Sequence, residues 1–212
     1  MNLAPINSLA PINPGALARL LSRRGLIFLV LALAACVPES QNPAGDPAKA
    51  VKDPALNGLW QADWEDGRLF LHVFDGGQGM VDVYTVNHKK DGGGEVDHYQ
   101  GFVSTVGNRR IANLQMADSG GEDSGGAATY VFVAYQMEAD GKLDAHFIDD
   151  KAFIAAVTAG KLKGQVSGEG EGQTVLLTDD AAKIVAFMAD QDDATLYGKG
   201  ILFRRIYPSA SN

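Results

Sequence analysis

Cysteine is almost absent from this chain of 212 residues, and its single copy, Cys36, excludes a scaffold held together by disulfide bonds. Basic residues are also few, with 18 Lys and Arg against 26 Asp and Glu and a formal net charge of −8. Such a chain repels a phosphate backbone, so nucleic acid is a poor partner. With 46% hydrophobic residues, the composition excludes a disordered tail and suits one globular domain with appendages.

Long apolar runs are missing too, since the longest covers only residues 25–35. These eleven residues are too few to cross a bilayer, which needs about 20. Arg19, Arg23 and Arg24 precede the run, and Cys36 follows it directly. A basic region, a short apolar region and small residues before a boundary are the pattern of an export signal.

The residues at this boundary, Leu33-Ala34-Ala35-Cys36, resemble a bacterial lipobox. The resemblance implies that Cys36 is lipidated on its sulfur and becomes the first residue of the mature protein. An ordinary buried cysteine would not explain the arginines and the small residues around it. We therefore predict a lipoprotein signal peptide over residues 1–35 and a membrane anchor at Cys36, with general secretion favoured over the twin-arginine route.

The flanks of the signal add two expectations. Residues 3–7 are repeated as residues 9–13, which has no evident role in a signal, so we interpret the start of the sequence as over-extended. Val37 and Pro38 stand where, by resemblance to enterobacterial sorting signals, an Asp would retain the protein in the inner membrane. We therefore expect delivery to the outer membrane, facing the periplasm, with 15 basic and 26 acidic side chains left after removal of the signal.

Residues 36–56 hold half of the chain's prolines and little that could be buried. This composition predicts an extended, semi-rigid tether with a reach of about 60 Å. Residues 57–212 contain one proline and 22 of the 25 glycines. We expect them to form a single globular domain that needs no disulfide bonds.

Most of this domain shows the period of β-strands, separated by Asp, Gly and Asn clusters. Asp140-Gly141 gives the clearest hairpin turn. Two short helices are expected near the C-terminus, one following Asp149 and one following Asp180, because acidic residues precede an apolar face in each. The predicted strands are Gly58–Trp64, Arg68–Phe74, Met80–Asn87, Val96–Val106, Arg109–Ala117, Ala128–Met137, Lys142–Ile148, Leu162–Val166, Thr174–Leu177 and Gly200–Tyr207.

The fold class is therefore mainly β, or α+β: an antiparallel meander forming a barrel or a curved sheet, with two short C-terminal helices. Asn57-Gly58-Leu59-Trp60 in the first strand and Arg204-Arg205 in the last resemble a lipocalin or calycin. In that family the Trp of a Gly-x-Trp motif packs under a late Arg at the closed end of the barrel. The resemblance implies a pair formed by Trp60 and Arg204 and a barrel that binds an apolar molecule. The chain also resembles small lipoproteins of proteobacterial envelopes, which implies a location and no activity.

Patterns for catalysis are lacking. The glycines around Ser124 are misplaced for a nucleophile elbow, and lipidation would consume Cys36. His72 and His146 could meet across a barrel near Asp144 and bind a metal. No two histidines have the spacing of a ligand motif, however, so we expect no metal, no cofactor and no catalytic residue.

Three hypotheses follow from these patterns. The first is a non-enzymatic outer-membrane lipoprotein that binds a small apolar ligand in a lipocalin-like barrel. The second is an interaction module with a filled core that docks on another envelope protein. The third, less favoured, is a metal-dependent enzyme. Beyond the lipidation site, the candidate residues of the domain are Trp60, His72, His146 and Arg204.

Overall fold

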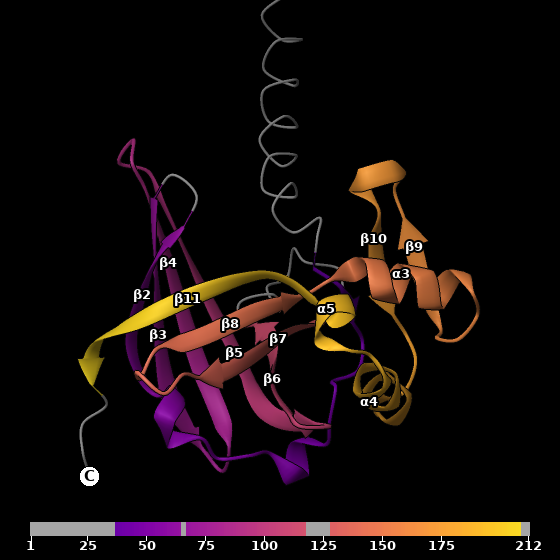
Figure 1. Cartoon of the computed structure of the whole chain (residues 1–212), viewed down its shortest axis with the longest axis horizontal. Helices are drawn as coiled ribbons and strands as arrows, with labels where there is room; N and C mark the ends of the chain where they lie inside the picture. The colour runs from indigo at the N-terminus through magenta and orange to yellow at the C-terminus, as the bar shows by residue number, and fades with distance from the viewer. Residues whose placement is uncertain (1–36, 65–66, 118–127, 209–212) are drawn as a thin grey trace, which may run out of the picture. The chain divides into compact units, whose positions relative to one another are not determined.

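The computed structural model describes residues 37–64, 67–117 and 128–208. Eight antiparallel strands close into a barrel, in which each strand pairs with its neighbours along the chain and β11 pairs with both β8 and β2 (Figure 1). This confirms the mainly β, lipocalin-like barrel. The barrel strands are β2 (Gly58–Trp64), β3 (Gly67–Gly77), β4 (Met80–Lys89), β5 (Gly94–Val106), β6 (Arg109–Met116), β7 (Tyr130–Met137), β8 (Leu143–Ile148) and β11 (Tyr197–Pro208).

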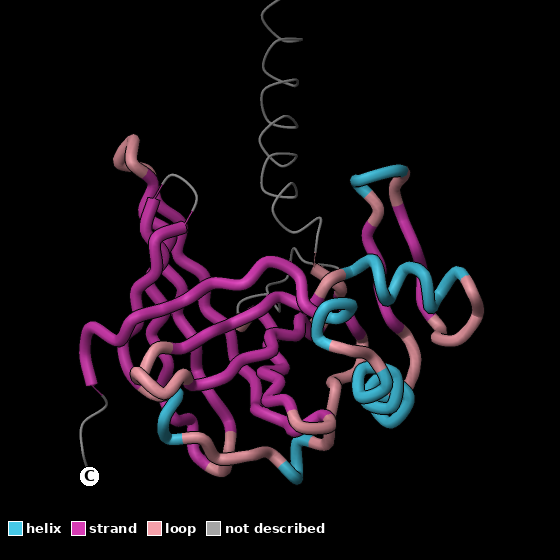
Figure 2. The backbone as a smooth tube through the Cα atoms, viewed as in Figure 1, coloured by secondary structure: helices cyan, strands magenta, loops and turns pink. Residues whose placement is uncertain are grey.

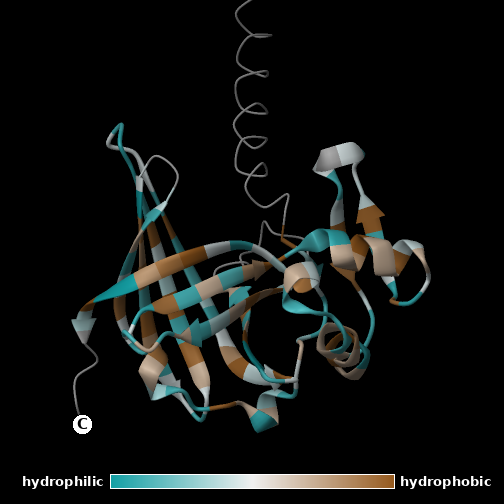
Figure 3. Cartoon of the chain, in the orientation of Figure 1, coloured by the Kyte–Doolittle hydropathy of each residue, from teal (hydrophilic) through white to brown (hydrophobic). Residues whose placement is uncertain are grey.

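Every second side chain of each strand points into the barrel, and these side chains form its core. Trp60 of β2 pairs with Leu71 of β3, and Val83 of β4 pairs with Tyr99 of β5, so these side chains share the inner face. Polar and apolar residues alternate in the strands of Figure 3 for the same reason. The buried members of this core are Leu56, Trp60, Ala62, Val73, Val81, Val83, Val103, Ala112, Leu114, Tyr135, Leu143, Ala145, Ile201 and Phe203.

The chain between β8 and β11 leaves the barrel and builds a second core. It contains α3 (Asp150–Thr158), β9 (Gly164–Ser167), η3 (Gly170–Gly172), β10 (Thr174–Leu177), α4 (Ala181–Asp190) and α5 (Asp193–Leu196). Phe153 of α3 and Ile184 of α4 are fully buried there, against Phe132 on the outer face of β7. The two expected helices are present, and α5 is an additional one, capped by the Asp192 side chain.

Short sequence patterns determine where a hairpin turns and where two helices begin. Gly141 has a φ of 80° in the turn between β7 and β8, as the Asp-Gly pair predicts. Asp149 and Asp180 are the N-caps of α3 and α4, each accepting a backbone N–H bond with its side chain. Residues 118–127, between β6 and β7, lie outside the described residues. No described helix combines the length and the apolar content that a membrane crossing requires.

The segment predicted to be a tether lies against the domain from residue 37 onward. It forms β1 (Glu39–Ser40), η1 (Pro47–Lys49) and η2 (Pro54–Leu56), and the stretch that holds η1 and η2 runs along one end of the barrel (Figure 2). The Ala44 amide donates to Asn113 Oδ1 at 2.6 Å, and the Val51 amide donates to the Val103 carbonyl at 2.7 Å. Backbone groups of the segment thus hydrogen-bond to the domain, and Ala44 and Leu56 are buried in the two cores, which the proline-rich composition does not reveal.

Candidate functional site

The barrel has two different ends. At the first, called the base, η2 lies beneath the barrel and β3 turns into β4, β5 into β6 and β7 into β8. At the second, called the far end, β2 is followed by β3, β4 by β5 and β6 by β7. Side chains of the two ends differ in burial and chemistry, so we describe the ends in turn.

Trp60 and Arg205 form the centre of the base. The Trp60 indole is fully buried, and its Nε1 donates to the Leu56 carbonyl of η2 at 2.9 Å. The Arg205 guanidinium lies over the indole ring, 4.1 Å from its centroid. It also donates to the carbonyls of Asn57, at 2.8 Å, and Ala55. One arginine thus joins the last strand to η2 and to the first strand.

Arg205, and not Arg204, therefore occupies the position that the resemblance gives to a late arginine. Successive side chains of a strand point to opposite faces, so Arg204 lies on the outer face. There its guanidinium donates to Gln61 Oε1 at 3.1 Å. The two arginines are adjacent in the sequence and could not be told apart there. The register of β11 against β2, in which Arg205 pairs with Trp60, decides which one reaches the indole.

A second polar link closes the base. The Tyr135 hydroxyl, on the inner face of β7, donates to Asp53 Oδ2 at 2.9 Å. Burial, and then the nearby Asp53 carboxylate, raise the pKa of Tyr135 well above its usual range. The phenol therefore stays neutral and remains a donor. Sequence reasoning missed this pair because the two residues are 82 positions apart.

Towards the far end, the inner face changes from fully buried to half-buried. Its apolar side chains there include two from β3 and two from β7, together with aromatic rings from three strands. The half-buried set here is Trp64, Leu69, Leu71, Tyr99, Val131, Val133 and Phe147, and Val51 and Met137 are half-buried nearer the base. An apolar wall that side chains do not fully cover is the setting in which apolar ligands bind.

A few polar groups accompany this wall. Thr85 donates to Asp97 Oδ2 at 3.2 Å on the inner face of β4 and β5. Burial, and then the charge of Asp97, raise the pKa of Tyr99, so its hydroxyl stays protonated. The Lys199 ammonium lies 3.7 Å from the centroid of the Trp64 ring. These groups can orient a polar end of a largely apolar ligand.

His72 and His146 do not meet. Both lie on the outer face of the barrel, on β3 and β8, and β2 and β11 lie between these strands. The His72 ring is 3.9 Å from that of Phe74, whereas His146 Nε2 is 3.1 Å from Asp144 Oδ2. The described residues hold no group of three or more side chains arranged to bind a metal. His72 and His146 therefore do not form the metal site considered from the sequence. Each alternates along its strand with apolar residues that face the core, so both histidines point outward.

Comparison with known proteins assigns the chain to no family, so its structural class is defined by its fold. No family model, curated protein or solved structure matches the chain. Eight antiparallel strands closed in sequence order, with a tryptophan and an arginine stacked at one end, define a lipocalin-like barrel. Cys36, the predicted lipidation site, lies outside the described residues.

Proposed function

We propose that this protein is a non-enzymatic lipoprotein of the outer membrane that binds a small apolar molecule in the far-end half of its barrel. The observation that supports this function best is the half-buried apolar wall formed by residues such as Leu71, Val133 and Phe147. A barrel with only a structural role is expected to fill its interior with side chains throughout. Here most inner side chains near the base are buried, whereas several towards the far end are half-buried.

The position of the first described residues supports a role at a membrane. Only Val37 and Pro38 separate Cys36 from β1, and the three Cα–Cα steps from Cys36 to Glu39 span at most about 11 Å. β1 pairs with Tyr130 and Val131, the first residues of β7, at the far end. An acyl chain on Cys36 would then hold the far end close to the lipid surface, where an apolar ligand can enter directly from the leaflet.

Native mass spectrometry of the full chain, isolated gently from bacterial membranes, tests the ligand. We expect an adduct of a few hundred daltons, within the ~300–1,000 Å³ size class of small-molecule sites, that is lost on denaturation. Leu71→Trp, which fills the inner face, should abolish both the adduct and binding of the apolar dye phenylnaphthylamine. Leu202→Trp, on the outer face where Leu202 is 52% exposed, is the matched control. A clean mass together with dye binding that is equal in both variants would refute the proposal.

A second function, docking on another envelope protein, is favoured by one specific observation. The outer face of β3, β4 and β5 exposes large apolar side chains, including Phe74 at 43% and Val96 at 68%. Phe74 and Tyr84 meet edge to face at 6.0 Å, and Tyr84 stacks on His98 at 4.1 Å. Exposed apolar surface of this kind marks interaction sites. Crosslinking in the envelope from a photoreactive residue at position 96 would identify such a partner.

A further inference from the structure

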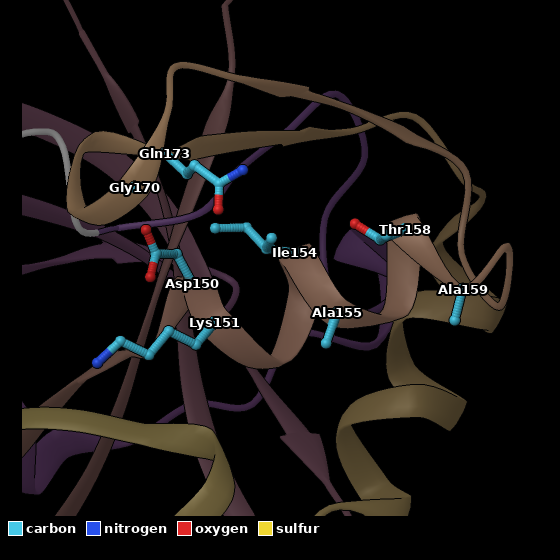
Figure 4. Close-up of a pocket in the computed structure, with 8 residues that line it drawn as sticks. All are labelled: Asp150, Lys151, Ile154, Ala155, Thr158, Ala159, Gly170 and Gln173. Atoms are coloured by element: carbon cyan, nitrogen blue, oxygen red, sulfur yellow. The ribbon is translucent and has the colours of Figure 1, made fainter.

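A separate hollow lies outside the barrel, between α3 and the hairpin of β9 and β10. It has a volume of about 460 Å³ and a largely apolar lining. One side is the stripe of Asp150, Ile154 and Thr158, which succeed one another at intervals of one helical turn. Gly170 and Gln173 of the hairpin form the other side, and Figure 4 shows Asp150 and Ile154 directed towards them.

Glycines stand at the tip of the hairpin, and one of them, Gly170, lines the hollow. Gly170 adopts a φ of 59°, which L side chains rarely adopt. A Cβ atom added at Gly170 or at Gly172 would meet nothing within 4 Å. Gly170 therefore lines the hollow without a side chain of its own. The opposite face of α3, with Phe153 and Ala156, is fully packed in the second core.

Asp150 is the unusual residue of the hollow. Its side chain is only 8% exposed, although an ionised carboxylate is rarely buried without a partner. The helix does not require it as a cap, because Asp149 is the N-cap and accepts the Lys151 amide at 2.8 Å. Burial, and then the adjacent Asp149, raise the pKa of Asp150, so the environment disfavours its charge.

Among the described residues, the cation that favours an ionised Asp150 is the neighbouring Lys151, and burial outweighs its effect on the pKa of Asp150. The ion pairs among them join other acidic side chains to Lys, Arg and His, and none includes Asp150. The neighbouring Lys151 is exposed, and in Figure 4 its side chain extends away from the hairpin. A buried carboxylate in an apolar hollow is costly unless a cation pairs with it. A cationic ligand would provide that partner.

We propose that this hollow binds a small molecule carrying a primary ammonium group on an apolar body. The ammonium pairs with the Asp150 carboxylate, and the apolar body lies against Ile154 and the glycine-bearing turn of the hairpin. Thr158 and Gln173 offer polar groups that orient a second substituent. The site is separate from the barrel interior, so its ligand and that of the barrel bind independently.

The test is an NMR titration of the full chain, in detergent solution, with 2-phenylethylammonium as the probe. The neutral probe 2-phenylethanol and the anionic probe 3-phenylpropionate have similar apolar bodies and serve as comparisons. Three variants are titrated in parallel. Asp150→Asn removes the charge, Ala155→Leu reduces the hollow, and Asp190→Asn removes an exposed acid elsewhere so that net charge matches that of Asp150→Asn.

We expect saturable shifts of the Gly170 and Gln173 signals with the ammonium probe, and affinity at least tenfold weaker for the alcohol. Asp150→Asn and Ala155→Leu should each weaken ammonium binding at least tenfold, whereas Asp190→Asn should leave it unchanged. Equal affinity for ammonium and alcohol, or ammonium binding that survives in Asp150→Asn, would overturn the proposal. So would the absence of any saturable shift at the hairpin. If Asp150→Asn does not fold, Ala155→Leu decides the question alone.

Discussion

Replacing Arg205 by alanine removes three interactions from the base of the barrel at once. The guanidinium loses its position over the buried Trp60 ring and its hydrogen bonds to the carbonyls of Asn57 and Ala55. A hydrogen bond from a charged donor contributes about 1.5–3 kcal/mol, and a cation–π contact at a partly exposed site about 0.5–1 kcal/mol. Arg205 is half-buried, so water can replace part of these interactions when the side chain is removed. We therefore expect the free energy of unfolding to fall by about 2–4 kcal/mol.

The adjacent Arg204 provides the matched control. It lies on the same strand, but its guanidinium makes one described hydrogen bond, to Gln61 on the outer face. Arg204→Ala should therefore cost less than about 1 kcal/mol. Both variants remove the same charge and the same side chain, so the difference between them isolates the base of the barrel.

Urea unfolding followed by far-ultraviolet circular dichroism measures both costs without relying on Trp60 fluorescence, which the substitution itself alters. With an m-value of about 2 kcal/mol/M, the midpoint should fall by about 1–2 M in Arg205→Ala and by less than about 0.5 M in Arg204→Ala. Arg205→Lys keeps a cation but not the planar fork, and should lie between them. Equal midpoint shifts in the two alanine variants would refute the role assigned to Arg205.

Three further outcomes are expected. Cys36→Ser should abolish labelling of the protein by a fatty-acid probe in cells, and unchanged labelling would contradict lipidation. Asn113→Ala removes a fully buried side chain that holds the Ala44 amide, so urea unfolding should show a loss of about 2–3 kcal/mol, with faster proteolysis of the N-terminal segment. Burial and Asp149 raise the pKa of Asp150 above 3.8, so the folded state binds more protons and loses stability as pH rises through that window. Asp150→Asn should therefore be more stable than the native chain at pH 7 but not at pH 3, and an equal difference at both pH values would contradict this.

Strand periodicity predicted the barrel because its inner and outer faces differ in chemistry along most strands. The predicted strand Gly58–Trp64 has the bounds of β2, and Asp140-Gly141 lies in the expected hairpin turn. The helices α3 and α4 were predictable for a similar reason, since Asp149 and Asp180 are local caps. These signals depend on residues that are close together in the chain, so they can be recognised from the sequence alone.

The features that the sequence did not reveal depend on contacts between distant residues. Arg204 and Arg205 are equivalent in composition, and only pairing with β2 decides which one reaches Trp60. Residues 37–56 offer little apolar surface, so their attachment through Asn113 and Val103 has no local signal. His72 and His146 point outward for a similar reason. Which face of β3 and β8 lies against the core is decided by pairing with other strands.

The groups that stabilise the barrel and the groups proposed to bind ligands lie in different places. At the base, Trp60, Tyr135 and Arg205 combine full or partial burial with hydrogen bonds to η2 and its cap. The far end contains half-buried apolar groups, and the hollow beside α3 contains a carboxylate whose pKa burial raises; these groups contribute less to folding or oppose it. Residues kept at a cost to stability are expected where a ligand provides the missing contacts. Substitutions at Leu71 or Asp150 should therefore change binding while the base keeps the chain folded.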